Sequence, residues 1–349
     1  MISDFCSNAI LTKVLSKYGQ RLRKKDYQSL VSCSNISQVA AYLKNNTSYR
    51  DILKDINEYD IHRGYLERKV SNRIFADMAS VFAYSTSSAK YFSEFIILSI
   101  ITKKLIRALV RIESYEATNV YMQVPNFVKK SVHIDFAALD KAQNYDEFLQ
   151  AIRHTDYYKI LKPIEFETDG TLNIPKLENV IYTYFYTKII SHIDKIADAK
   201  TKKELVDFMT EIINAQNYVN IVRLKKLYKA APDKILDLII PMGFFKTKKG
   251  KLAIDTPNFD EFCNVLADTS VCKKFEKYDC SYDELVYKIE YKNARKNIRF
   301  SASPTVIAYS YFILMEIELL NIIHIVEGVR YGISKEDIEK LLITKYTNQ

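Results

Sequence analysis

The residues best suited to chemistry in this chain stand inside an apolar stretch, residues 303–346. Glu316, Glu318 and Asn321 interrupt that stretch with polar side chains. Two carboxyl groups and an amide on one helix could form a polar seam that faces a cavity or a partner. They could also form a satisfied hydrogen-bonded set that fixes how the helix packs against its neighbours. We favour the packing interpretation and keep the functional one open.

Neither the histidines nor the cysteines form a recognisable catalytic or metal-binding pattern. The histidines show no H-E-x-x-H arrangement, and we expect them to be surface or capping residues. The cysteines are odd in number and contain no C-x-x-C pair, which favours a reducing compartment over disulfides or a structural zinc site. The residues concerned are His62, His133, His154, His192 and His324, and Cys6, Cys33, Cys263, Cys272 and Cys280.

A phosphate-binding loop needs G-x-x-x-x-G-K-[ST], because backbone N–H groups must wrap the phosphates. The nearest match runs from Gly243 to Leu252, with the wrong spacing and no hydroxyl after the lysine. We interpret it as a basic surface loop. The sequence therefore predicts no catalytic residue, no cofactor-binding residue, no cofactor and no metal ligand.

The apolar stretch itself predicts a helical hairpin with one buried helix. Ser303 and Pro304 predict a helix start, and the run from Val306 to Met315 is apolar enough to be covered on all sides. Gly328 offers a left-handed stop, and Ser334 begins a second helix.

A membrane span is the alternative for this buried helix. A bilayer needs about 20 apolar residues, and the run from Val306 to Met315 is shorter than that. Glu316 and Glu318 would each cost about 2.5 to 3.5 kcal/mol inside the membrane. We therefore expect a core helix and no direct membrane span.

The composition predicts an all-α fold. Glycine and proline number seven each in 349 residues, too few for the turns of a β-rich chain. The net charge of +9 favours an acidic partner or surface. The N-terminus shows no basic segment followed by a long apolar one, so we expect no secretory signal.

An internal repeat organises the chain. A helix-capping Asn is followed by apolar and hydroxyl residues at offsets 4, 8, 11, 13 and 17 in the second and third copies, and the first copy matches after one extra residue. The three copies of this series are Asn35, Val39, Leu43, Thr47, Tyr49 and Leu53; Asn144, Phe148, Ile152, Thr155, Tyr157 and Leu161; and Asn258, Phe262, Leu266, Thr269, Val271 and Phe275.

Each copy is followed by a strongly apolar closing helix with one small polar residue in mid-run. These helices lie in residues 95–114, 215–240 and 303–343, and the polar residues are Ser99, Asn220 and Asn321. The strings NIVRLKKLY and NIIHIVEGV relate the second helix to the third. The series and its closing helix predict a module of about 110 residues that occurs three times.

The sequence resembles a known family. The motif E-x-E-x-x-N-I, Glu316 to Ile322, with EGVRYGISKEDIEKLL after it, is similar to the C-terminal signature of the C subunit of prokaryotic A-type/V-type rotary ATPases, equivalent to the d subunit of eukaryotic vacuolar enzymes. RLRKKDYQSLVSCSNISQVAAYLKNNTSY resembles the family's N-terminal region, and AQNYVNIVRLKKLY its central region. The resemblance covers almost the whole chain.

The resemblance implies a funnel-shaped, all-α protein with three similar helical subdomains in a pseudo-threefold arrangement. Together with the repeat, it places them at residues 1–122, 123–241 and 242–349. It also implies a non-catalytic central-rotor subunit on the cytoplasmic face of the membrane, which connects the central stalk to the membrane rotor ring. The implied partners are the ring subunits and the central stalk subunits, with no nucleic acid.

The alternative is a free-standing helical-repeat adaptor that binds acidic proteins or nucleic acid. Basic clusters could support it, but they are interleaved with Asp and Glu, and solvated helix faces explain most of them. The clusters are Arg21–Lys25, Lys103–Arg107, Lys225–Lys229, Lys246–Lys251 and Lys288–Arg299.

Overall fold

Every element in the described part of the chain is a helix, which confirms the predicted all-α class. The computed structural model describes residues 2–57, 61–82, 87–114, 124–164, 166–167, 170–196, 198–275 and 281–343. The first predicted domain boundary, at residues 122 and 123, lies outside these ranges, as does Cys280; the side chain of Cys6 is also not described.

The chain divides into two compact units. Unit 1 contains Met1–Ser93, Asn119–Pro125 and Glu290–Gln349, and unit 2 contains Glu94–Thr118 and Asn126–Ile289. The helices of unit 1 are α1 (Ile2–Gly19), α2 (Lys24–Val31), α3 (Ile36–Asn46), α4 (Arg50–Leu53), α5 (Arg63–Phe82), α18 (Pro304–Arg330) and α19 (Lys335–Leu341). The helices α6 (Ser87–Ser114) and α17 (Tyr282–Phe300) each have residues in both units.

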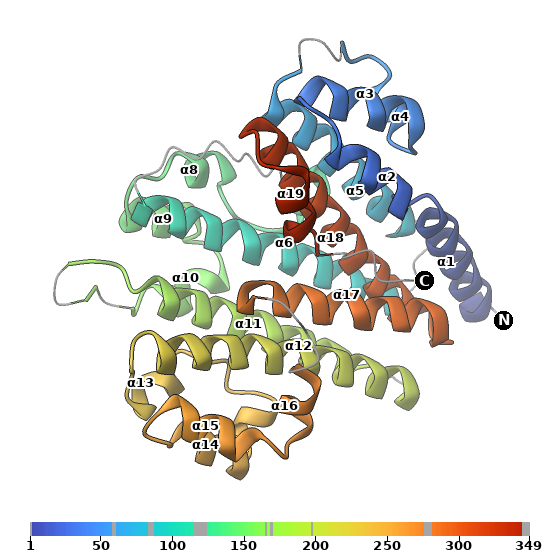
Figure 1. Ribbon diagram of the computed structural model, residues 1–349. Coiled ribbons are helices and arrows are strands. Elements are labelled where there is room, and N and C mark those ends of the chain that lie inside the picture. The colour runs from blue at the N-terminus through green and yellow to red at the C-terminus, as the bar shows by residue number, and fades with distance from the viewer. Residues whose placement is uncertain are drawn as a thin grey trace. The chain divides into compact units, whose positions relative to one another are not determined.

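Helix α18 is the centre of unit 1. It packs against α1, α5, α2, α3 and α19, and Figure 1 shows it in red among the blue N-terminal helices. It begins as predicted, because the Ser303 hydroxyl accepts a hydrogen bond from the Val306 N–H and Pro304 occupies the first turn. Every residue from Val306 to Met315 is buried.

Helix α18 is also long and apolar enough to cross a membrane, judged by length and composition within the described residues. However, 78% of its most apolar window is buried in the structure. The core helix of a soluble fold passes the same test, so this finding is weak support for a span.

The predicted stop at Gly328 is wrong, because α18 continues to Arg330. The left-handed residue is Gly332, with φ of 65°. The Ile333 N–H donates to the Gly328 carbonyl at 2.9 Å, and the Gly332 N–H donates to the Val329 carbonyl at 3.3 Å. This is the Schellman pattern of a helix end.

Gly328 has a packing role instead. A Cβ atom at this position would lie 2.5 Å from Cγ1 of Ile338, a buried residue of α19. The absence of a side chain therefore allows α19 to approach α18. Helix α19 begins at Ser334 as predicted, where the hydroxyl accepts the Asp337 N–H at 3.2 Å.

Unit 2 is built from shorter helices around two long ones. They are α7 (Asn126–Ser131), α8 (Phe136–Lys141), α9 (Tyr145–Ala151), α10 (Asp156–Leu161), α11 (Ile174–Asp194), α12 (Ala199–Lys226), α13 (Pro232–Asp237), the 3-10 helix η2 (Phe244–Lys246), α14 (Lys248–Ile254), α15 (Phe259–Leu266) and α16 (Ser270–Phe275). Helix α12 packs against α11, α15 and η2.

The three copies of the series share local geometry. In each copy the Asn side chain accepts a hydrogen bond from the backbone N–H three residues on, at 2.9 Å, and so begins α3, α9 and α15. All twelve apolar members of the three series are buried. Each Thr hydroxyl donates to a carbonyl in the last turn of the preceding helix or just after its end, at 2.6 to 2.7 Å.

Each closing helix contacts another copy of the repeat, at its series or just before it. Helix α6 contacts the residues just before the second series, where the Arg111 guanidinium donates to the carbonyls of Leu139 and Ala142 at 2.8 and 3.1 Å. Lys104 of α6 also pairs with Asp140.

Helix α12 contacts the third series in a similar way. The Tyr218 ring lies 6.2 Å from that of Phe262 and 5.1 Å from that of Phe275. The Lys225 amine donates to the Thr256 carbonyl. Thr256 and Ala142 both precede the capping Asn by two residues, so a cation of the closing helix reaches the same backbone position in both pairings.

Helix α18 completes the order by contacting the first series, through α3 and through Tyr49. The first closing helix thus meets the residues just before the second series, the second helix meets the third series, and the third helix meets the first series. Each of the three pairings lies within one compact unit.

The Gly328→Ala substitution tests the approach of α19. The added methyl group must displace Ile338, and we expect the free energy of unfolding to fall by about 1–3 kcal/mol, measured by urea denaturation with circular dichroism. Gly64→Ala in α5 is the matched control, because a Cβ there meets nothing within 4 Å. We expect the control to be neutral or slightly stabilising. Equal effects of the two substitutions would contradict the packing role of Gly328.

Candidate functional site

Glu318 is the most connected of the three polar residues in α18. Its Oε2 accepts the backbone N–H of Leu22 at 2.9 Å, and its Oε1 accepts the Tyr49 hydroxyl at 2.7 Å. The residue is only 6% exposed. Both donors come from the N-terminal elements of unit 1, so this carboxyl group ties α18 to the loop before α2 and to the first series.

The protonation of this pair is governed by burial. Burial raises the pKa of the Glu318 carboxyl, while the hydrogen bonds from Tyr49 and Leu22 and the charge of Arg73 act in the opposite direction. Burial, followed by the negative charge of Glu318, raises the pKa of Tyr49 well above its usual range. A general base must reach a substrate proton, whereas both oxygens of this carboxyl group already bind protein donors.

Arg73 of α5 connects Tyr49 to a second set of charges. Its guanidinium lies 4.7 Å from the centre of the Tyr49 ring, and its Nη1 donates to the Ser48 hydroxyl at 2.9 Å. Its Nε lies 3.4 Å from Oδ2 of Asp77, which also pairs with Lys17 of α1. These contacts join α1, α4, α5 and α18 through polar groups.

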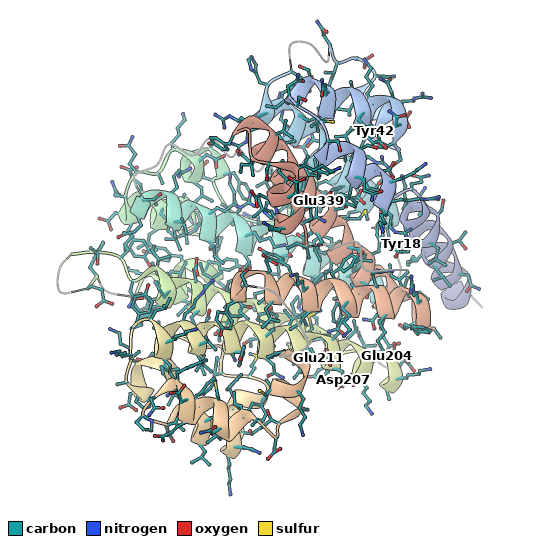
Figure 2. The ribbon with its side chains drawn as sticks, in the orientation of Figure 1. Tyr18, Tyr42, Glu204, Asp207, Glu211 and Glu339 are labelled. Atoms are coloured by element: carbon teal, nitrogen blue, oxygen red, sulfur yellow. The ribbon has the colours of Figure 1, made fainter. Side chains whose placement is uncertain are left out.

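A small pocket lies against this network. Its cavity volume is about 10 Å³, at the lower limit for one water molecule and far below the roughly 300–1,000 Å³ of small-molecule sites. Its lining is Lys17, Gln20, Arg21, Tyr49, Arg73, Ile74, Asp77, Met315 and Glu318. Tyr18, labelled in Figure 2, lies beside it on α1, with the Arg21 guanidinium 3.9 Å from its ring centre. Most of the polar lining is already engaged in the hydrogen bonds and ion pairs described above.

Asn321 also has a structural partner. It is fully buried, and its Oδ1 accepts the Ile343 N–H at 2.9 Å, which holds the chain after α19 against α18. Glu316, the third polar residue of the stretch, is half-buried. The structure thus brings Glu318 and Asn321 into separate hydrogen-bonded positions, each directed to protein groups.

The predicted counterpart of Asn321 in α12 needs correction. Asn217, not Asn220, is fully buried and holds the returning chain: it accepts the Ile240 N–H and donates to the Ile240 carbonyl, both at 2.8 Å. Asn220 is half-buried, and its side chain has no hydrogen bond among the described residues. The sequence signal that could have identified Asn217 is its spacing to a later isoleucine. Ile240 follows Asn217 by 23 residues, and Ile343 follows Asn321 by 22 residues.

The histidines of the sequence do not converge. His62, His133 and His154 are exposed. His192 lies 3.2 Å from a Glu94 oxygen, and Nδ1 of His324 lies 3.0 Å from the Leu341 carbonyl oxygen. In the part of the chain that the structure describes, no group of three His, Cys, Asp or Glu residues has metal-site geometry.

The segment from Gly243 to Leu252 is not the predicted loop, because it forms η2 and the first part of α14. Its glycines pack against neighbouring atoms and do not wrap a phosphate. A Cβ on Gly250 would lie 2.3 Å from the Phe244 carbonyl oxygen, so this glycine allows η2 to pack against α14. Gly243 has φ of 72°, and the adjacent Phe244 N–H donates to the Asn214 side chain at 2.7 Å. Both glycines therefore serve backbone packing.

Taken together, these contacts define an all-helical scaffold whose buried polar residues hold helices and returning chain segments. The profile of the ATP synthase (C/AC39) subunit family matches residues 10–341. The chain therefore belongs to that family, the C subunit of ATP synthases, which is a non-catalytic structural subunit of the rotary ATPase.

Individual relatives agree with this assignment. The chain is similar to the C subunit of the A-type ATP synthase of Archaeoglobus fulgidus, with 22% identity over 95% of this chain and 94% of that protein. It is also similar to the C subunit of the Methanosarcina barkeri enzyme, with 28% identity over 57% and 55% of the two chains. The match to the C subunit of the Methanosarcina mazei enzyme has 33% identity over 36% of this chain, and spans about a third of that relative's length.

Replacing the two asparagines of α12 separately tests which of them holds the returning chain. Asn217→Ala leaves the buried N–H and carbonyl of Ile240 without their side-chain partner, and we expect a loss of about 2–3 kcal/mol in the free energy of unfolding. Asn220→Ala is the matched control, with an expected change within about 0.5 kcal/mol. Thermal and urea unfolding measure both. A larger loss of unfolding free energy for Asn220→Ala would instead support Asn220 as the counterpart of Asn321.

Proposed function

We propose that this chain is the central-rotor socket of a V/A-type rotary ATPase. In this role it connects the central stalk to the membrane rotor ring and transmits torque for ATP-coupled H⁺ or Na⁺ transport. Its partners are the ring subunits and the central stalk subunits, and it acts on the cytoplasmic face of the membrane. The observation that carries the proposal is the family match over residues 10–341.

The mechanical properties of the fold support this role. A torque coupler must resist twisting, and densely packed helices have low compressibility. The closing helices α6, α12 and α18 are 28, 28 and 27 residues long, or about 40 Å each. Helix α18 is fixed by side-chain bonds to residues almost 300 positions earlier in the chain.

The domain organisation belongs to the same proposal. We place three similar helical subdomains at residues 1–122, 123–241 and 242–349, in a funnel-shaped, pseudo-threefold arrangement. Its support is the order of the pairings, in which the closing helices meet the second, third and first copies of the repeat in turn. Such an order is expected of three modules that close on one another.

Deletion of the gene tests the proposed function. Inverted membrane vesicles from the deletion strain should lose ATP-driven ion uptake, because no element would connect the stalk to the ring. The strain complemented with the wild-type gene is the control and should recover uptake. A tagged copy of the chain should co-purify with ring and stalk subunits. Full coupled transport in the deletion strain would refute the proposed role.

A further inference from the structure

The basic charge of this chain is concentrated in one part of unit 2. Residues 223–252 contain nine Lys and Arg residues and two Asp residues, a net charge of +7, while the whole chain carries +9. They form the C-terminal end of α12, α13, η2 and α14, which pack against one another (Figure 1). We call the exposed lysines of this segment the basic surface: Lys226, Lys229, Lys234, Lys246, Lys248, Lys249 and Lys251.

These lysines lack acidic partners in the described part of unit 2. None of the seven takes part in an ion pair with a described residue. The acidic residues of α12 that Figure 2 labels, Glu204, Asp207 and Glu211, lie in the N-terminal half of that helix. Twelve residues separate Glu211 from Arg223, or about 18 Å of helix. This separation exceeds the roughly 8 Å Debye length at physiological ionic strength. The nearer acidic residues are Asp233 and Asp237, which the net charge of +7 already includes, and Asp255 and Glu261, whose charges act on the buried Lys225.

Large apolar side chains protrude among the lysines. Leu227 is 69% exposed, Tyr228 is 74% exposed and Leu252 is 59% exposed. Leu227 and Tyr228 occupy the turn after α12, and Leu252 lies on α14, which packs against α13 and η2. Exposed leucine and tyrosine next to basic residues are typical of surfaces that enter a membrane interface.

The turn that presents Leu227 and Tyr228 is held in an unfavourable backbone conformation. Lys229 has φ of 47°, the single positive φ among the described non-glycine residues. The turn after α18 places Gly332 in this conformation instead. A lysine there costs roughly 1–2 kcal/mol relative to relaxed backbone, so a charged residue occupies a position where glycine is physically preferred.

We propose that the basic surface binds the anionic phospholipid headgroups of a membrane. Its charges are point-like lysine ammonium groups, which suit a diffuse anionic surface, whereas protein interfaces are enriched in arginine and depleted in lysine. The exposed Leu and Tyr side chains enter the headgroup boundary while the lysines remain among the phosphates. This inference concerns the isolated chain and does not depend on the proposed rotor role.

Vesicle binding tests the proposal with the full chain. Vesicles of phosphatidylglycerol and phosphatidylcholine in equal parts should co-sediment with the protein at low salt, and phosphatidylcholine vesicles should not. Lys248→Gln/Lys249→Gln/Lys251→Gln should weaken binding on the order of a hundredfold, about fivefold for each charge removed. Lys229→Gly should weaken it about fivefold while keeping or raising the melting temperature, because glycine accepts the φ at this position.

Tyr331→Ser is the matched control. Tyr331 is 67% exposed at the turn after α18, outside the basic surface, and its loss should leave vesicle binding unchanged. Tyr228→Ser should lower binding. Equal binding to both kinds of vesicle, unchanged binding by the lysine variants, or equal effects of Tyr331→Ser and Tyr228→Ser would overturn the proposal. Absence of vesicle binding, with capture of an acidic protein or nucleic acid by the same lysines, would also overturn it.

Discussion

The hydrogen bonds of the Glu318 carboxyl group are the interaction on which unit 1 depends. Helix α18 is apolar almost all round, so hydrophobic burial alone would leave its rotation and its axial position weakly specified. The Leu22 N–H and the Tyr49 hydroxyl fix both, because each must meet a particular oxygen of one side chain. Breaking such a buried set costs far more than its net contribution to stability, since the remaining groups lose their partners.

Buried polar side chains also fix the positions of helices in unit 2. Asn217 binds both polar groups of Ile240, and cations from α6 and α12 bind carbonyls two residues before a capping asparagine. Buried polar groups thus set the register of the long helices, while leucine, isoleucine and aromatic side chains supply most of the burial. A protein built this way resists deformation, because densely packed helices have low compressibility.

The sequence predicted features whose cause is local. The three capping asparagines bind an N–H three residues away, and the start at Ser334 likewise depends on neighbours. The sequence-based predictions failed where contacts between residues far apart in the chain determine the structure. Gly328 and Gly332 are both plausible helix ends, and only the approach of Ile338 distinguishes them. Asn217 and Asn220 lie on one side of α12, and only the position of Ile240 selects Asn217. The partners of Glu318 lie 269 and 296 residues away, beyond any local pattern.

A double-mutant cycle between Tyr49 and Glu318 tests the central claim most directly. The free energies of unfolding are measured for the wild type, Tyr49→Phe, Glu318→Gln and the double variant. If this bond holds the third closing helix to the first series, the coupling energy is about 1–3 kcal/mol, and each single variant loses most of what the double variant loses. Additive losses, with a coupling energy near zero, would contradict the account.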